Sequence, residues 1–370
     1  MSARRSPRVL QLVLSLNPGG TERLVLELVK RLHSDLPMAV CCLDERGAWA
    51  PELESRGIAV EELRRGPGFR PALGRAVAAA ARRHDADVVH CHHYSPFIYG
   101  CLARVWRRGL QVVFTEHGRL SDAKPSRKRR VANGLFARVP SGVFAVSGDL
   151  RAHLIEEGFP AGAVRVIYNG IEAGPIPREA DRAAVRQRLG VEPGEVTVIG
   201  TIARLDPVKD LGTLCRAMVE VRHHRRAMLI VVGEGPERGP LEALVRDLDL
   251  HDAVRFLGAR NDARAWLAGC DVYVNSSISE GVSLTILEAM AAALPIVATK
   301  VGGTPEVVHE SCGRLIAPRS PAPLAGALLE LSNSAALRDR LGREARRRVE
   351  ATFSLDRMVR EYREVYSALA

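Results

Sequence analysis

The chain has 370 residues, 46% of them hydrophobic, which is enough to form the cores of two domains of ordinary size. It contains no apolar run of the ~20 residues that cross a bilayer, and its basic opening segment lacks the apolar stretch and cleavage site of a signal peptide. Its 7 cysteines form no CxxC pair, so we expect neither a zinc site nor a disulfide framework, and we interpret the chain as a soluble cytoplasmic protein.

Positive charge is concentrated in the first half of the chain. The 53 Lys and Arg against 43 Asp and Glu give a net charge of +10. Residues 1–180 hold 27 basic and 18 acidic residues, a balance of +9, whereas residues 181–370 hold 26 and 25, a balance of +1. A partner of the first half is therefore predicted to be anionic, either a membrane surface or a phosphate-bearing acceptor. An ordinary solvated surface would have the same composition.

The first elements form a place where backbone can approach a phosphate. Arg8–Leu16 is apolar enough for a strand, Asn17–Gly20 (NPGG) forms a turn, and Thr21–Leu32 has helical spacing. Gly19 and Gly20 allow close approach of the backbone, and the helix start supplies free amides. Many α/β domains begin in this way, so the pattern alone has low specificity.

Further strands alternate with helical stretches through the first half. They are predicted at Met38–Leu43, Ile58–Glu61, Asp87–Cys91, Gln111–Thr115 and Val143–Val146. This alternation predicts an α/β fold with a parallel, doubly wound sheet.

The strand at Asp87–Cys91 leads into His90, His92, His93 and Tyr94. Three histidines in four residues could bind a metal, but strand alternation would send His92 and His93 to opposite faces, and the nearby carboxylates lie at the other end of the strand. We therefore favour a polar strand end beside a ligand site.

Gln111–Gly118 ends in Glu116-His117-Gly118, so His117 stands at the carboxyl end of a buried strand, where parallel sheets bind ligands. The alternative is a hydrogen-bonded structural histidine.

The run Ser121–Val139 combines basic and apolar residues. Its cations are Lys124, Arg127, Lys128, Arg129 and Arg130, beside Val131, Leu135, Phe136 and Val139. A basic amphipathic helix at Lys124–Arg130 would lie peripherally on the anionic inner face of a membrane, and the alternative is a solvated face. Nucleic acid is disfavoured as a partner because aromatic side chains for base stacking are nearly absent here.

The second half opens with the strand Val196–Ile202, followed by Arg204 and Lys209. A forked guanidinium and a point charge at a strand end can clamp a diphosphate. Leu229–Gly239 contains Gly233-x-Gly235, but the third glycine of a dinucleotide fingerprint is misplaced and Pro236 occupies the turn, so NAD binding is disfavoured.

The stretch from Asn275 to Val307 contains more candidate ligand-binding groups than any other part of the sequence. A short strand leads into a polar loop, and the helical spacing that begins at Leu284 stops at Pro295. Ser283 is the expected N-cap, behind which free amides can meet an anion. Glu280 and Glu288 stand with seven residues between them. The amides could bind phosphate and the two carboxylates could bind hydroxyl groups, and a nucleotide sugar contains both.

The Glu280-x7-Glu288 spacing resembles the signature of the family-4 retaining glycosyltransferases. The resemblance extends over most of the chain, including the Gly-Gly-Thr-Glu-Arg opening, the inter-domain segment Val166–Ile171 and the turn Gly302–Glu306. It implies the glycosyltransferase-B (GT-B) fold, an α/β architecture of two Rossmann-like doubly wound parallel-sheet domains facing a cleft. The implied boundaries are 1–171 for the acceptor-side domain, 172–180 for a linker, 181–353 for the nucleotide-sugar domain and 354–370 for a helix crossing back to the first domain.

The resemblance also implies residue roles. The catalytic set is His117, which would contact the transferred sugar, with Glu280, Arg204 and Lys209. Glu288 would bind the ribose, and the Ala259–Arg260 turn would lie against the base. The remaining donor-side residues are Gly19, Gly20, Gly233, Gly281, Val282, Ser283 and Leu284. The acceptor-side residues are His93, Tyr94 and Arg119.

The sequence departs from the common family pattern at Val282, where a bulky residue is frequent, and at Ala293, where Gly is usual. No metal or cofactor is expected. The Asp85/Asp87 and Asp247/Asp249 pairs do not stand at the carboxyl end of a strand, where a metal–diphosphate site would lie.

The implied function is transfer of a sugar, with retention, from a UDP- or GDP-sugar to a glycan or lipid-linked acceptor in cell-surface polysaccharide synthesis. The exopolysaccharide- and exosortase-associated transferases are the implied subgroup. Alternatives are a nucleotide-sugar epimerase or hydrolase on the same fold, or a non-catalytic nucleotide-sugar-binding protein.

Overall fold

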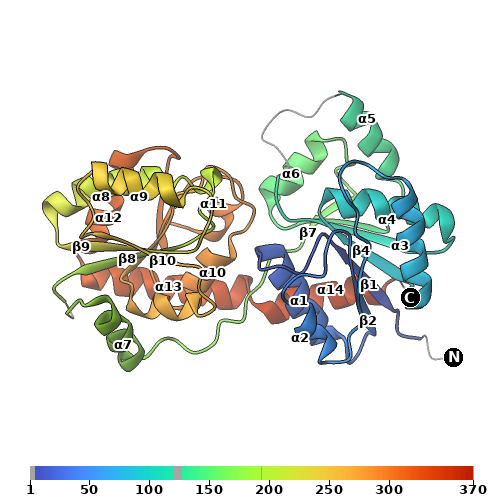
Figure 1. Cartoon of the computed structure of the whole chain (residues 1–370), viewed down its shortest axis with the longest axis horizontal. Helices are drawn as coiled ribbons and strands as arrows, with labels where there is room; N and C mark the ends of the chain where they lie inside the picture. Colours follow the sequence, from blue (N-terminus) through green and yellow to red (C-terminus); the bar gives the residue numbers. More distant parts are fainter. Residues whose placement is uncertain (1–4, 120–126, 193, 370) are drawn as a thin grey trace. The chain divides into compact units, whose positions relative to one another are not determined.

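The computed structural model describes residues 5–119, 127–192 and 194–369 (Figure 1). The chain divides into two compact units. The first comprises Met1–Gly170 together with Asp356–Ala370, and the second comprises Ile171–Leu355. Each unit has its own sheet and core, and each is described by itself.

The first unit is built on a parallel sheet. Within the described residues its seven strands run in the order β3-β2-β1-β4-β5-β6-β7. The strands are β1 (Val9–Val13), β2 (Met38–Cys42), β3 (Val60–Glu62), β4 (Val88–His92), β5 (Gln111–Glu116), β6 (Gly142–Ala145) and β7 (Val164–Val166). The order reverses direction between β1 and β4, and doubly wound sheets bind ligands at such a point.

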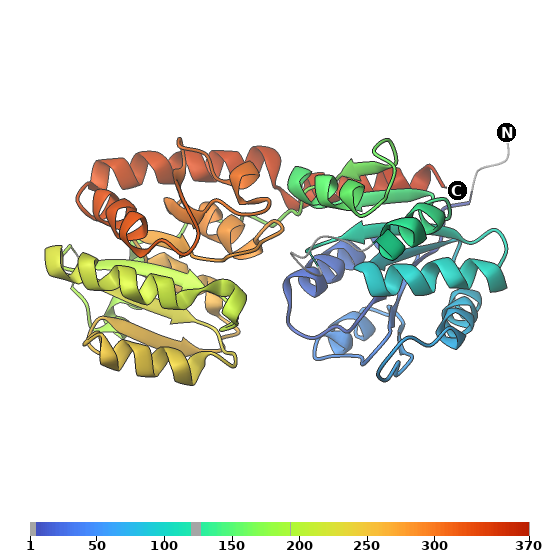
Figure 2. The ribbon, with the colours of Figure 1, turned by 90° about the horizontal axis from the view of Figure 1, so that it is seen from above.

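Helices cover both faces of this sheet. They are α1 (Gly20–Leu32), α2 (Ala50–Glu54), α3 (Ala72–Arg83), α4 (Tyr94–Trp106), α5 (Arg127–Phe136), α6 (Gly148–Glu156) and α14 (Leu355–Ser367). Figure 1 shows α3 and α4 on one face and α1 and α14 on the other. In Figure 2 the red C-terminal helix runs alongside the blue-to-green part of the chain, so the last residues return to the first unit.

The second unit repeats the plan with a smaller sheet. Its six described strands are parallel and run in the order β10-β9-β8-β11-β12-β13. They are β8 (Thr197–Ile202), β9 (Ala227–Val232), β10 (Val254–Gly258), β11 (Val272–Asn275), β12 (Ile296–Thr299) and β13 (Gly313–Ile316). Here the order reverses direction between β8 and β11, so their carboxyl-terminal loops are neighbours.

The helices of the second unit flank its sheet. They are α7 (Glu179–Leu189), η1 (Pro207–Lys209), α8 (Leu211–His224), α9 (Arg238–Asp247), η2 (Ala263–Gly269), α10 (Leu284–Ala291), α11 (Thr304–Val307), α12 (Pro321–Ser332) and α13 (Ala335–Thr352). Figure 1 shows α8 and α9 on one face and α10 and α13 on the other. The core beneath α8 and α12 is formed by buried aliphatic side chains such as Leu214, Leu229 and Leu328.

The prediction of two Rossmann-like parallel-sheet domains is confirmed. The apolar runs identify the strands because a strand covered on both faces is apolar along its whole length. The helix expected within Ser121–Val139 is described only at Arg127–Phe136, and the part of the run before Arg127, including Lys124, lies outside the described residues.

Candidate active site

The loop that carries Arg204 follows β8 and is held by the loop after β9. The Ala203 amide donates to the Val232 carbonyl at 3.0 Å. A Cβ atom at Gly233 would lie 1.9 Å from the Ala203 carbonyl oxygen, and one at Gly235 would lie 2.5 Å from the carbonyl oxygen of the residue after Arg204. The Gly-x-Gly pattern therefore serves close packing of two loops, which is a reason for glycine other than dinucleotide binding.

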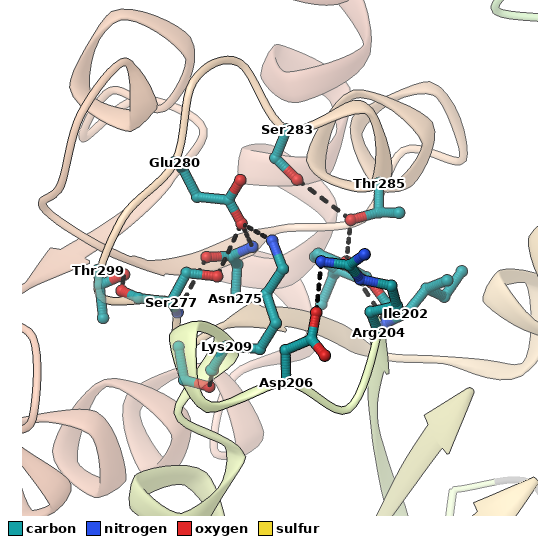
Figure 3. A network of polar contacts seen from close by, with 12 residues as sticks. Ile202, Arg204, Asp206, Lys209, Asn275, Ser277, Glu280, Ser283, Thr285 and Thr299 are labelled. Atoms are coloured by element: carbon teal, nitrogen blue, oxygen red, sulfur yellow. Dashed lines mark hydrogen bonds and ion pairs between the residues drawn. The ribbon is translucent and has the colours of Figure 1, made fainter. Parts of the chain in front are cut away.

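Lys209 and Glu280 meet at the centre of the site (Figure 3). The Lys209 ammonium donates to Glu280 Oε1 at 2.6 Å. The same oxygen accepts from Ser277 Oγ at 2.7 Å and from Asn275 Nδ2 at 3.2 Å. The carboxylate side chain is only 10% exposed. Three converging donors therefore hold a nearly buried anion in a defined orientation.

Backbone contacts tie the two loops together. The Ile278 amide donates to the Val208 carbonyl at 2.9 Å, and Ser276 Oγ donates to the Lys209 carbonyl at 2.8 Å. Arg204 forms an ion pair with Asp206, yet its side chain is 75% exposed and its guanidinium can reach an outside anion. The structure thus brings Lys209 and Glu280 into direct contact and leaves Arg204 beside them (Figure 3).

Ser283 stands at the N-cap of α10, but its side chain does not cap the helix. Its backbone is extended, and its hydroxyl lies 3.2 Å from Thr285 Oγ1 instead of bonding to a first-turn amide. The hydroxyl of Thr285 is itself 2.8 Å from the Tyr273 hydroxyl. Because the Ser283 side chain does not cap the helix, the first-turn amides of Leu284, Thr285 and Ile286 are available to another acceptor, and the helix dipole favours an anion there.

The turn after β12 supports the backbone of Glu280. Gly302 has φ of +50°, and a Cβ atom on it would lie 1.8 Å from the Glu280 carbonyl oxygen. The Gly303 amide donates to the same oxygen at 3.3 Å. The two glycines of the Gly302–Glu306 motif therefore shape the loop that presents the carboxylate.

The rest of the Glu280–Glu288 segment is more enclosed. Gly281 lies in the loop, Val282 is buried, and Glu288 is half-buried one turn into α10. Ala293 follows α10 with φ of +59°, a left-handed conformation that costs a residue with a Cβ atom.

Arg260 follows β10 in the second unit. It pairs with Asp262 at 2.9 Å and lies over the Trp266 ring, 5.4 Å from its centroid. The preceding Ala259 is exposed. Asp262 and Trp266 thus orient the Arg260 side chain at this turn.

In the first unit, His117 follows β5 and contacts other histidines. Its Nε2 lies 2.9 Å from His92 Nδ1, and its own Nδ1 is buried without a hydrogen-bond partner among the described residues. Burial, together with the charges of His92 and His93, lowers the pKa of His117 well below its ordinary value. His117 is therefore a neutral imidazole at neutral pH.

His93 does not point away from His92 as strand alternation predicts. The strand ends at His92, and His93 has φ of 74°, so the alternation does not continue through it. The rings of both residues lie 5.2 Å from the His117 ring. His93 Nδ1 is 3.0 Å from Glu116 Oε1, and its Nε2 is 2.9 Å from Thr21 Oγ1.

The pKa of His93 is raised although the ring is buried. Burial acts to lower the pKa, but the hydrogen bond to Glu116 and the negative charges of Glu116 and Glu22 outweigh it. Glu22 belongs to the first turn of α1, and a Cβ atom at Gly19 would lie 2.2 Å from its Oε2. Gly19, the N-cap residue of α1, is thus close to an acidic side chain, and Gly20 is the first residue of the helix.

Tyr94 and Arg119 are held by neighbours within the first unit. The Tyr94 hydroxyl donates to Asn133 Oδ1 at 2.5 Å, and Arg119 pairs with Asp149 at 2.7 Å. These contacts orient both side chains without closing the exposed surface of Arg119.

The described residues contain no group of three or more His, Cys, Asp or Glu arranged to hold a metal ion. Asp85 pairs with Arg8, and Asp87 accepts from the Arg8 amide at 2.9 Å, so both have structural partners.

Three residues that contact the candidate site residues were not predicted from the sequence. Asn275 and Ser277 bind Glu280, and Thr21 binds His93. Their position at strand and helix ends was visible, but hydroxyl and amide residues are common in such loops and carry no distinct signal.

Two family profiles match the chain. One, described as glycosyl transferases group 1, matches residues 196–334, and the other, described as glycosyltransferase family 4, matches residues 18–174.

Individual relatives are consistent with these profiles. The chain is 28% identical over 306 residues to N-acetyl-alpha-D-glucosaminyl L-malate synthase of Bacillus anthracis, covering 81% of this chain and 79% of that one. It is 31% identical over 331 residues to D-inositol 3-phosphate glycosyltransferase of Kineococcus radiotolerans, covering 80% and 74%. Anabaena HepE in complex with UDP is 27% identical with a TM-score of 0.87, covering 98% and 100%. The same protein has also been crystallised with UDP-glucose.

Proposed function

The chain belongs to the family-4 glycosyltransferases, and from this premise we propose that it transfers a sugar from a UDP-sugar to a glycan or lipid-linked acceptor with retention of configuration. Its fold is the two-domain GT-B architecture. Glycosyl transfer from a nucleotide sugar follows from the family, whereas the base, the sugar, the acceptor and the stereochemical outcome are the proposal.

The observation that supports this donor best is the group formed by Lys209, Arg204, Glu280 and the uncapped start of α10. Two cations and free amides suit a diphosphate, and a rigidly held carboxylate suits sugar hydroxyls. UDP is favoured over GDP because HepE, at 27% identity, was crystallised with UDP.

The leaving diphosphate needs stabilisation of its growing negative charge. Lys209, Arg204 and the amides at the start of α10 would supply this charge stabilisation, without a metal ion. When Lys209 turns towards phosphate, Glu280 still keeps its hydrogen bonds from Asn275 and Ser277. All three donors bind Oε1, which leaves Oε2 for donor hydroxyls, while Glu288 would bind the ribose.

A screen of labelled nucleotide sugars tests this function. We expect saturable binding and slow hydrolysis of a UDP-sugar, faster turnover when the acceptor is added, and unchanged activity in EDTA. Loss of activity in EDTA that Mg²⁺ restores would contradict the charge stabilisation by protein groups. Conversion of the donor to its epimer without an acceptor would indicate an epimerase, and binding without turnover would indicate a binding protein.

We place the acceptor in cell-surface polysaccharide synthesis, in the exopolysaccharide- and exosortase-associated subgroup. The Gly-Gly-Thr-Glu-Arg opening and the segment from Thr115 to Arg119 support this assignment. A small anionic acceptor is the second candidate, because the first half of the chain has a balance of +9 and two relatives are named for malate and inositol phosphate. Lipid-linked and small acceptors can be compared directly in the same assay.

Contact with an anionic membrane is proposed through α5. Arg127 and Arg130 are exposed, and the large apolar side chains of Val131 and Leu135 are 67% and 60% exposed. Spacings of three and four residues place this set on one side of the helix. The proposed contact is peripheral, as for a basic amphipathic helix that lies on a membrane surface. Among the described residues no helix is long and apolar enough to cross a membrane.

Sedimentation with vesicles tests the membrane proposal. The wild type should bind vesicles that contain phosphatidylglycerol and dissociate as salt increases. The combined change Arg127→Gln, Arg130→Gln and Leu135→Ser should abolish binding and leave donor hydrolysis unchanged. Binding that persists in this variant would show that α5 is an ordinary solvated helix.

A further inference from the structure

A chain of buried polar side chains leads from the C-terminal helix to His117. The Tyr366 hydroxyl on α14 lies 2.6 Å from His90 Nδ1 and 3.1 Å from Gln11 Nε2. Gln11 Oε1 lies 2.8 Å from His92 Nε2, and His92 Nδ1 lies 2.9 Å from His117 Nε2. Gln11 and His92 are 0% and 2% exposed, so water does not compete for these bonds. These side chains therefore form one hydrogen-bonded network. Once the donor and the acceptor of one hydrogen bond are known, those of the other bonds follow.

The orientation of the Gln11 amide determines which partner donates in each of these hydrogen bonds. Gln11 Nε2 also faces the sulfur of Met38 at 3.9 Å. A thioether accepts hydrogen bonds but cannot donate them, so the amide nitrogen and not the oxygen must face Met38. Gln11 Oε1 then faces His92 and accepts the proton carried by its Nε2.

The tautomers of the two histidines follow from this orientation. Burial lowers the pKa of His92 and of His117, so each ring is neutral and carries one proton. Because His92 carries its proton on Nε2, its Nδ1 must accept, and His117 must donate from Nε2. His117 Nδ1 is then a bare lone pair.

The surroundings of His117 Nδ1 agree with this assignment. The atom is buried and has no hydrogen-bond partner among the described residues. An unpaired buried N–H group is rarer than an unpaired acceptor, so a lone pair is the better tolerated state. The lone pair is thus an acceptor that the described residues leave unused, and a ligand hydroxyl can reach it once the groups that cover Nδ1 move aside.

We propose that Gln11 and His92 are positioning residues that hold His117 in its Nε2–H tautomer, so that Nδ1 accepts a hydrogen bond from a hydroxyl of the transferred sugar. The assignment of the sugar rests on the proposed function, whereas the tautomer does not. The Tyr366 hydroxyl accepts a hydrogen bond from the Gln11 amide, so the C-terminal helix α14 helps to orient Gln11.

Nuclear magnetic resonance of protein with ¹⁵N-labelled histidine tests the tautomer in the wild type. The His117 signals are assigned by their loss in His117→Gln. We expect a protonated Nε2 and an unprotonated Nδ1, and a protonated Nδ1 would overturn the proposal. This measurement needs no substrate, so it decides the proposal even where no sugar donor is turned over. Failure of turnover alone would count against the proposed function.

Two substitutions at Gln11 separate positioning from packing. Gln11→Glu preserves the hydrogen bonds in its neutral form, in which it accepts from His92 and donates to Tyr366, so in that form it should keep the tautomer and most of the activity. Gln11→Leu removes the acceptor, and we expect His117 to shift towards Nδ1–H with a fall of about tenfold or more in kcat/KM for UDP-glucose. Equal spectra for Gln11→Leu and the wild type would overturn the proposal. If Gln11→Leu does not fold, the wild-type and Gln11→Glu spectra decide.

Discussion

Lys209 and Glu280 neutralise each other in the free protein, and this pairing keeps both side chains ready for a donor. Their contact of 2.6 Å joins two loops that follow neighbouring strands. The carboxylate has two further donors, whereas the ammonium is 22% exposed and contacts Glu280 alone among the side chains that the structure describes. The lysine is thus the partner that can turn towards a diphosphate while Glu280 stays in place.

Lys209→Ala should therefore lose most of the turnover and remain folded. Losing one preorganised contact to the leaving group costs about 2–4 kcal/mol of transition-state stabilisation, seen as a fall in kcat/KM. Arg226→Ala is the matched control, since Arg226 is an exposed cation of the same unit paired with Glu195. Wild-type kcat/KM in Lys209→Ala would show that the diphosphate clamp is misassigned.

At the scale of elements, two turns fix the geometry of the segment between Glu280 and Glu288. The turn after β12 supports its start through Gly302, and the turn after α10 ends it at Ala293. In the turn after β12 the left-handed position is occupied by Gly302, whereas in the turn after α10 it is occupied by Ala293.

Gly302→Ala should displace the Glu280 loop. The added Cβ atom would lie 1.8 Å from the Glu280 carbonyl oxygen, and the φ of +50° is itself unfavourable for alanine. We expect loss of donor binding, measured by calorimetry. Gly326→Ala in α12 is the control, because its Cβ atom would meet no atom within 4 Å and alanine favours a helix. If Gly302→Ala binds the donor with the affinity of the wild type, the turn after β12 does not position Glu280 for donor binding.

Ala293→Gly should stabilise the second unit by about 1 kcal/mol, because glycine adopts positive φ without the penalty of a Cβ atom. The Ala293 amide donates to the Met290 carbonyl at 3.0 Å, a backbone hydrogen bond that does not involve the side chain and that glycine can also form. The midpoint of urea unfolding measures the effect, followed by Trp266 fluorescence in a background in which Trp49 and Trp106 of the first unit are replaced by Phe. A lower midpoint would mean that the alanine methyl group packs more favourably than the geometry indicates.

At the scale of the whole molecule, the chain closes on itself by returning α14 to the first unit. This helix buries Tyr362 and Tyr366 against the polar face formed by β1, β4 and β5. The first unit consequently encloses His90, His92 and His117 in a setting where a positive charge is unfavourable.

Acid should therefore destabilise the first unit. Burial lowers the pKa of His90, His92 and His117, so the unfolded chain binds more protons, and their contribution to stability is present above pH ~6.5 and is lost below it. The pKa of His93 is raised, so its contribution is full below pH ~6.5 and is lost as pH rises through its folded value.

Between pH 7 and 5.5, each of the three buried neutral histidines should lower the free energy of unfolding by about 1 kcal/mol. Hydrogen exchange of the β4 and β5 amides measures this opening. His90→Gln should make the stability less dependent on pH than it is in the wild type, and the exposed His223→Gln should leave the pH dependence unchanged. A stability that is constant across this range would show that the buried histidines are not neutral.

The sequence by itself determined the two parallel sheets and the main donor-side candidates. Buried parallel strands are apolar along their length, and Arg204, Lys209 and Glu280 follow such strands, where ligands bind. Only the tertiary structure decided which groups touch. Gln11 and Tyr366 are separated by 355 positions and Lys209 and Glu280 by 71, and no periodicity carries information over such distances. Strand alternation also failed at His93, because one positive φ redirects a side chain that the pattern places on the other face.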